Sequence, residues 1–178
     1  MQATLVYPHQ LFKKHPALHA QRRVYFIEEP LIYGCDHHWP LTHHARRNAL
    51  LKEAGEHYIN KLEDDGFEVT RIALPPHHGT DQKGKAESPL DQLPKKVTEL
   101  HLARVVDDLL GRRLESWAQA REVKIVWYDT PNFLTPDDWW QAHFAGKKKP
   151  FMAHFYKAQR KRMKILVDDD NIPTGGQW

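Results

Sequence analysis

Five short apolar runs, separated by polar and helix-like segments, constrain the fold of this chain more than any other feature. The runs are rich in β-branched and aromatic residues and end at proline, glycine or charged positions, which is typical of buried strands. They cover 3–7, 23–28, 67–73, 97–105 and 123–128. Because strands that alternate with helices are joined by right-handed crossovers, the sequence predicts an α/β fold with a doubly wound sheet of about five mainly parallel strands, flanked by helices.

Helical patterns lie between and after these runs. Apolar residues recur at spacings of three and four over 42–65, and Gly66 is placed to end that helix in a left-handed conformation. A second pattern covers 107–120. Thr135, followed by proline and two acids, predicts a capped helix start, and Pro150 opens the last predicted helix.

Length and composition describe one ordinary globular domain. The chain has 178 residues, 40% of them hydrophobic and 28% charged, so collagen-like and wholly disordered proteins are excluded. Uncharged stretches are too short to cross a bilayer, and residues 1–20 carry no secretory signal pattern. The single Cys35 excludes an internal disulfide and a four-cysteine cluster within this chain, so we expect a cytoplasmic protein without membrane contact.

The positive charge is concentrated in one segment. Residues 147–164 hold eight Lys and Arg residues and no acid, whereas the other 160 residues carry 18 cations and 23 acids. Aromatic residues Phe151, Phe155 and Tyr156 lie among the cations. Two interpretations stay open: a nucleic-acid interface, or an amphipathic helix that docks its rings on another surface, which the helical spacing of the rings favours. The nucleic-acid candidates are Lys157, Arg160, Lys161 and Arg162.

Common catalytic and metal-binding motifs are absent from the sequence. Histidines are paired at 37/38, 43/44 and 77/78, but adjacent residues point in different directions and do not form a chelate, so we predict no metal site. The glycine-containing segment 79–85 lacks the residue order of a phosphate-binding loop. Neither of the two serines, Ser88 and Ser116, lies in a nucleophile elbow, and Cys35 beside histidines is weak evidence for a nucleophile. An independent enzyme therefore ranks last, below the three hypotheses given at the end of this section.

The predicted binding region lies at the carboxyl ends of the first two strands. Ligands of doubly wound sheets bind in the crevice outside these ends, which here carry the turn 8–11 and the loop 31–41. Glu28 and Glu29 end the second strand. They could accept hydrogen bonds from a heterocycle or from ribityl hydroxyls, or they could pair with Arg46 or Arg47.

The order of several motifs resembles a known family. LVYPHQLF, VYFIEEPLIYG, HHARRNALLKEAGEHYINKLEDDGFEV, VKIVWYDTPNFLT and FAGKKKPFMAHFYKAQRKRMKILVDDDNIPTGGQW follow one another along essentially the whole chain. The chain thereby resembles the amino-terminal antenna domain of the bacterial deoxyribodipyrimidine photolyase-related proteins, the iron–sulfur photolyase–cryptochrome branch. The resemblance implies a Rossmann-like antenna domain over 1–134 and a helical extension over 135–178 that leads toward a carboxy-terminal helical domain.

The resemblance also implies cofactors and partners. The antenna domain of the family holds 6,7-dimethyl-8-ribityllumazine, whereas FAD and a 4Fe–4S cluster belong to the carboxy-terminal domain, which we expect to be absent because the sequence stops at Trp178 within the family motif G-G-x-W-N-F-D. His9 stands where the family has aspartate in D-Q-L, which removes a hydrogen-bond acceptor for the pigment. The other implied pigment-binding residues are Gln10, Leu11, Glu28, Glu29, Tyr33, His44 and Arg47.

These observations lead to three ranked hypotheses. The first is the light-harvesting-chromophore domain of a photolyase or cryptochrome-related protein, which is not catalytic alone. Its partners would be its own carboxy-terminal helical domain and, through the complete protein, DNA. The alternatives are a diverged, stand-alone module with a nucleotide-like crevice and no pigment, and a nucleic-acid-binding module that acts through the basic segment.

Overall fold

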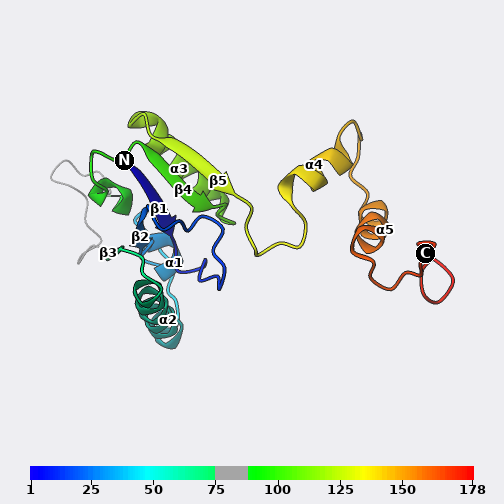
Figure 1. The fold of residues 1–178 in the computed structure, drawn as a ribbon, viewed down its shortest axis with the longest axis horizontal. Coiled ribbons are helices and arrows are strands. Elements are labelled where there is room, and N and C mark those ends of the chain that lie inside the picture. Colours follow the sequence, from blue (N-terminus) through cyan, green and yellow to red (C-terminus); the bar gives the residue numbers. More distant parts are fainter. Residues whose placement is uncertain (75–87) are drawn as a thin grey trace. The chain divides into compact units, whose positions relative to one another are not determined.

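The computed structural model of the chain describes residues 1–74 and 88–178. The glycine-containing segment 79–85 and the histidine pair 77/78 lie outside the described residues. In the described part, a five-stranded parallel sheet carries helices on its faces (Figure 1). The predicted Rossmann-like α/β architecture is confirmed.

The sheet has the strand order β3-β2-β1-β4-β5, and every neighbouring pair is parallel. All five strands lie within the runs predicted from the apolar pattern, except that the first begins one residue earlier. Their bounds are β1 Gln2–Val6, β2 Arg23–Ile27, β3 Val69–Ile72, β4 Glu99–Ala103 and β5 Lys124–Tyr128. The chain therefore builds outward from β1 through β2 to β3, then returns to the other side of β1 with β4.

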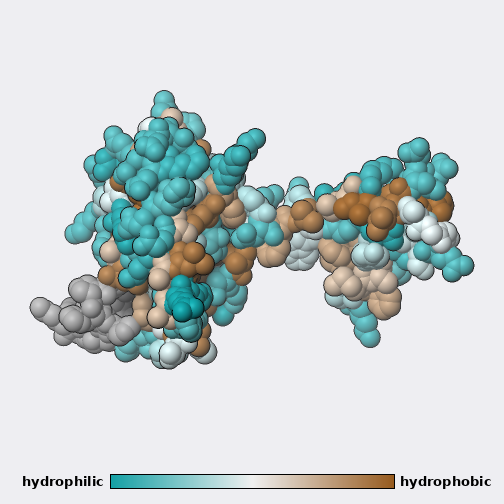
Figure 2. All heavy atoms as spheres, turned by 90° about the horizontal axis from the view of Figure 1, so that it is seen from below, coloured by the Kyte–Doolittle hydropathy of each residue, from teal (hydrophilic) through white to brown (hydrophobic). Residues whose placement is uncertain are grey.

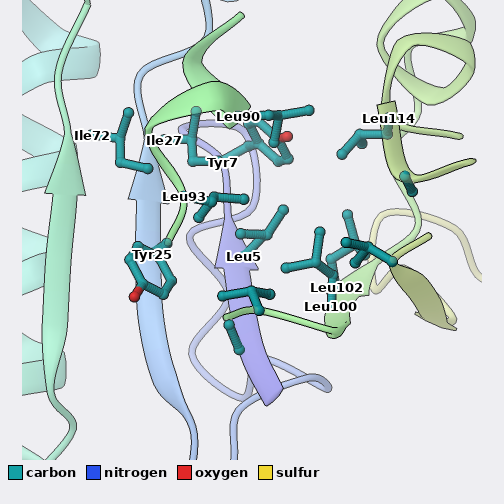
Figure 3. Packing of buried hydrophobic residues seen from close by; sticks show 14 of the residues in the cluster. Leu5, Tyr7, Tyr25, Ile27, Ile72, Leu90, Leu93, Leu100, Leu102 and Leu114 are labelled. Carbon is teal, nitrogen blue, oxygen red and sulfur yellow. The ribbon is translucent and has the colours of Figure 1, made fainter. Parts of the chain in front are cut away.

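Alternation along the strands separates two cores. Leu5 in β1 and Tyr7 directly after it point to one face of the sheet. There they pack with Ile27 and with residues of α3 (Asp108–Ala120) and of the short 3-10 helix η1 (Pro89–Gln92) (Figure 3). Val6 and Phe26 point to the opposite face and pack on Tyr58, Ile59 and Leu62 of α2 (Ala45–Asp64). The inner strands β1, β2 and β4 are thus buried on two faces, which explains why they are near-continuous apolar runs.

The helices begin and end close to the predicted positions, with local differences. Helix α2 begins at Ala45 rather than Thr42, because the side chain of His44 caps it. The loop predicted over 31–41 begins within a one-turn helix, α1 (Pro30–Tyr33), which ends at Gly34 with φ +78°. Gly66 has φ +89°, so its predicted left-handed conformation is confirmed.

The described chain forms two compact units, Met1–Asn132 and Phe133–Trp178. The second unit contains α4 (Asp137–Phe144) and α5 (Met152–Met163), joined by contacts among Trp139, His143, Phe144 and Phe155. The predicted hydroxyl cap of α4 is wrong: Pro136 is the N-cap, and the hydroxyl of Thr135 instead accepts a hydrogen bond from Gln159.

Much apolar side-chain surface of the second unit is exposed (Figure 2). No residue of α4 or α5 is fully buried, so this unit has a thin core. No helix of the described ranges, 1–74 and 88–178, is long and apolar enough to cross a membrane.

Candidate ligand-binding site at the carboxyl edge of the sheet

The strand order creates a switch point between β1 and β4. The chain continues from β1 to β2 on one side and from β4 to β5 on the other side. Between such diverging connections lies the crevice where doubly wound folds bind ligands. Residues that follow β1, β2 and β4 meet at this carboxyl edge.

Gln10 spans the switch point. Its backbone N–H donates to the carbonyl of Tyr7 at 2.8 Å, and its buried side-chain Nε2 donates to the carbonyl of Ala103, the last residue of β4, at 2.9 Å. The side chain therefore ties the turn after β1 to the end of β4. Its Oε1 is buried and has no hydrogen-bond partner among the described residues.

Two rings beside Gln10 also hold polar atoms without partners. The hydroxyl of Tyr7 and Nε2 of His9 are both buried and have no hydrogen-bond partner in the described part of the chain. Burial, with the nearby Glu29 carboxylate, raises the pKa of Tyr7 well above its ordinary value. Burial lowers the pKa of His9 to about 4, against an opposing effect of Asp107, so His9 is neutral at physiological pH.

Glu29 lies on the same face as Tyr7 and is almost completely buried. Its carboxylate caps α1 by accepting the N–H of Leu31 at 3.4 Å. Burial raises its pKa to about 7, although the Leu31 N–H and the charge of Arg113 act in the opposite direction. Glu29 therefore changes charge near neutral pH, a property of groups in functional sites.

A bidentate ion pair lies next to Glu29. The guanidinium of Arg113 on α3 donates to the two carboxylate oxygens of Asp36 at 2.5 and 3.0 Å. Asp36 also accepts the backbone N–H groups of His38 and Trp39, at 3.0 Å each. Burial alone would raise the pKa of Asp36, but the Arg113 hydrogen bond and these N–H groups lower it. The pair fixes the loop after α1 against α3.

Glu28 points to the opposite face of the sheet. One of its oxygens pairs with Arg71 of β3 at 2.5 Å, and the other accepts the N–H of Leu74 at 2.9 Å. Arg71 also pairs with Glu56 of α2. The alternative that Glu28 pairs with Arg46 or Arg47 is wrong, because its cationic partner comes from the neighbouring strand.

The remaining residues implied by the resemblance lie around α1 and α2. Tyr33 is buried near Glu28; its hydroxyl has no partner in the described ranges, and burial raises its pKa to about 12. Nδ1 of His44 accepts the N–H of Arg46 at 3.2 Å, and Arg47 donates to the carbonyl of Ile32 at 2.8 Å. Leu11 packs against the core on the α2 face.

On the α3 face, Glu29 lies near Tyr7, and both His9 and Glu29 lie near Asp107, the N-cap of α3. Gln10, next to His9 in the sequence, bonds the end of β4. Glu28 and Tyr33 form a separate group on the α2 face. Tyr7 is absent from the site residues predicted from the sequence. Because side chains alternate between the two faces of a sheet, the positions of Ile27 and Glu29 on one face could have indicated that Tyr7, just after the neighbouring strand β1, lies on that face too. The Arg113–Asp36 pair joins residues 77 positions apart and gives no local signal.

The basic residues of α5 make mostly internal contacts. Arg160 donates to the carbonyls of Ile165 and Leu166, and Arg162 donates to the carbonyl of Leu134 at 2.8 Å. Lys157, Arg160 and Lys161 surround the ring of Trp178 at 5.7, 5.0 and 5.4 Å from its centroid. The two arginines therefore hold this unit together, and a nucleic-acid role stays a prediction.

Metal chemistry has no candidate in the described ranges. Within residues 1–74 and 88–178, no three His, Cys, Asp or Glu side chains are arranged to hold a metal ion.

The fold and the polar carboxyl edge define a doubly wound α/β protein with a candidate ligand site at its switch point. Residues 4–178 match the family described as "Deoxyribodipyrimidine photo-lyase-related protein", and the chain belongs to that family. The resemblance inferred from the motifs is confirmed at the level of the family.

Two relatives differ greatly in length. The chain is 26% identical over 182 residues to "Uncharacterized protein R852" of Acanthamoeba polyphaga mimivirus, covering 98% of this chain and 88% of that protein. It is 27% identical over 141 residues to a "(6-4) photolyase" of Agrobacterium fabrum, covering 76% of this chain and 26% of the photolyase. The alignment therefore spans about a quarter of the photolyase.

Proposed function

We propose that this chain is the pigment-holding α/β domain of a photolyase-related protein, with 6,7-dimethyl-8-ribityllumazine bound at the carboxyl edge on the α3 face. Family membership supports the general role. The observation that carries the site is the set of three buried polar atoms without partners in the described chain, on Tyr7, His9 and Gln10, with the titratable Glu29 close to Tyr7.

The chemistry of these groups fits a heterocycle with a polyhydroxylated side chain. A buried polar atom without a partner costs about 1–3 kcal/mol, and hydroxyl groups of a ligand relieve that cost. The Tyr7 hydroxyl can donate, Gln10 Oε1 can accept, and a neutral imidazole such as that of His9 can do either through Nε2. His9 can therefore make a hydrogen bond where the family uses aspartate.

The surrounding contacts hold these groups in fixed positions before a ligand arrives. The hydrogen bond from Gln10 Nε2 to the Ala103 carbonyl fixes the orientation of the side-chain amide, and with it the position of Oε1. The Arg113–Asp36 pair holds the loop beside Glu29. A site that is already ordered loses less conformational entropy on binding.

When bound, the pigment would absorb light and pass its excitation energy to a flavin. This chain's residues make and break no bond in that process, because their role is to bind and orient. Light-driven DNA repair or blue-light sensing would belong to a complete protein, in which a carboxy-terminal helical domain binds FAD, a 4Fe–4S cluster and DNA.

The test is a fluorescence titration of the chain with 6,7-dimethyl-8-ribityllumazine. We expect saturable binding at micromolar concentrations. The affinity should be about tenfold weaker in Tyr7→Phe, because this is the effect of losing one hydrogen bond to a ligand. Tyr33→Phe is the matched control, since Tyr33 is also buried and lacks a hydroxyl partner in the described residues but lies with Glu28.

Three outcomes would contradict the proposal. Absence of saturable binding to the folded wild-type chain would remove the pigment role. Unchanged affinity in Tyr7→Phe, or a loss in Tyr33→Phe in place of Tyr7→Phe, would remove the α3-face site.

A further inference from the structure

A groove of about 830 Å³ runs along α3, and its lining is both aromatic and cationic. Its volume lies within the range of small-molecule sites. Seven lining residues follow one stripe of the helix at alternating spacings of three and one. The stripe consists of Leu109, Arg112, Arg113, Ser116, Trp117, Ala120 and Arg121, and Trp39, Ser88 and Asp91 complete the groove.

The two indole rings of the groove differ in how they are held: the Trp117 ring is hydrogen-bonded, whereas the Trp39 ring is exposed. Nε1 of Trp117 donates to Asp91 Oδ1 at 3.0 Å, and the same oxygen accepts from Arg121, whose guanidinium lies 5.0 Å from the Trp117 ring centroid. The Trp117 ring is therefore fixed. Trp39 is 61% exposed, but its backbone N–H is anchored on Asp36 at 3.0 Å. The groove thus offers an accessible aromatic surface on a held loop.

Of the three arginines, Arg112 has the most exposed ion-pair partner, which an incoming ligand displaces most easily. Arg113 is engaged by Asp36, and Arg121 by Asp91. Arg112 pairs with Asp108 one helical turn away at 2.6 Å, with both side chains largely exposed, at 69% and 82%. Such exposed pairs contribute at most about 1 kcal/mol, so an incoming anion can replace Asp108.

We propose that this groove binds a nucleotide, with a phosphate on Arg112 and the base stacked on Trp39. Arginine recognises phosphate through two parallel N–H bonds, and indole faces stack on any base. Ser116 adds a hydroxyl to the lining of the groove. The proposal does not depend on the pigment site, which lies at the carboxyl edge and shares only Arg113 with the groove. The nucleotide could be free or part of a single strand.

Equilibrium binding to the full chain tests this inference with two probes. One is fluorescent ATP carrying a ribose label, and the other is short labelled oligo(dT). Arg112→Gln should weaken binding about tenfold, and Trp39→Ala several-fold, because one charge-assisted contact and one stacking contact are lost. Both side chains are exposed, so circular dichroism should show an unchanged fold.

A control variant separates the groove from general electrostatic attraction. Lys52→Gln removes one exposed charge from α2, which lies outside the groove. It should bind within about twofold of wild type. Saturable ATP binding without oligo(dT) binding identifies a free nucleotide, and displacement of ATP by oligo(dT) identifies a single strand. Failure of both probes to bind wild type, wild-type affinity in Arg112→Gln, or an equal loss in a control variant would overturn the inference.

Discussion

Replacing Glu29 by glutamine should make the chain more stable at alkaline pH, which is unusual for a buried polar residue. Burial raises the pKa of Glu29 from an ordinary value near 4.5 to about 7. The folded protein therefore holds a proton that the unfolded chain releases. Stability from this group is fully present below about pH 4.5 and is lost as the pH rises through about 7, a total of about 3 kcal/mol. Glutamine keeps the shape and an acceptor for Leu31 but never ionises.

Urea denaturation of both proteins, followed by circular dichroism, measures this effect. We compare the free energies of unfolding at about pH 5 and about pH 8. The stability of Glu29→Gln relative to wild type should rise by about 2 to 3 kcal/mol between these values. Comparing the two proteins at each pH cancels titrations that they share, including those of the buried histidines His9 and His15.

A flat difference between the two proteins across this pH range would refute the reasoning. It would mean that Glu29 ionises at its ordinary pKa and that the carboxyl edge is well solvated. A relative loss of stability in Glu29→Gln at alkaline pH would mean that the charged carboxylate has a strong partner, in contradiction to its burial.

Three further changes test other contacts of the carboxyl edge. Glu28→Gln should destabilise the protein by about 1–2 kcal/mol at neutral pH, opposite in sign to Glu29→Gln, because Glu28 is buried and ion-paired; urea denaturation measures it. Gly34→Ala should cost about 3 kcal/mol or more in the same assay, since φ is +78° and a Cβ would lie 2.2 Å from a backbone oxygen. Gly66→Ala is its control and should cost only about 1 kcal/mol, because φ is +89° but nothing lies within 4 Å. Tyr7→Phe should unfold at higher temperature than wild type in calorimetry, since it removes a buried hydroxyl without a partner in the described chain, and a lower transition temperature would contradict that.

The sheet could be predicted from the sequence because the pattern that marks each strand lies within the strand and its immediate neighbours. Each strand is a short apolar run between polar or glycine and proline positions, and in β1, β2 and β4 burial on both faces makes that signal continuous. A helix start is harder to predict where two signals compete. Thr135 precedes proline and two acids, yet its hydroxyl bonds Gln159 from α5, and this tertiary contact has no sequence signal.

The candidate site was only partly visible in the sequence. Glu28 and Glu29 are adjacent and form one acidic end of a strand in the sequence, but alternation sends them to opposite faces, with different partners and different electrostatics. The ion pair of Arg113 with Asp36 depends on the packing of α3 against the loop after α1, which only the folded chain defines.

A crystal structure of the chain grown with 6,7-dimethyl-8-ribityllumazine is the most direct test of the central claim. We predict electron density for the pigment at the carboxyl edge of β1 and β4, with polar atoms of the ligand on the Tyr7 hydroxyl, Gln10 Oε1 and Glu29. Density on the α2 face beside Tyr33, in the α3 groove, or nowhere in a well-ordered crystal would contradict it.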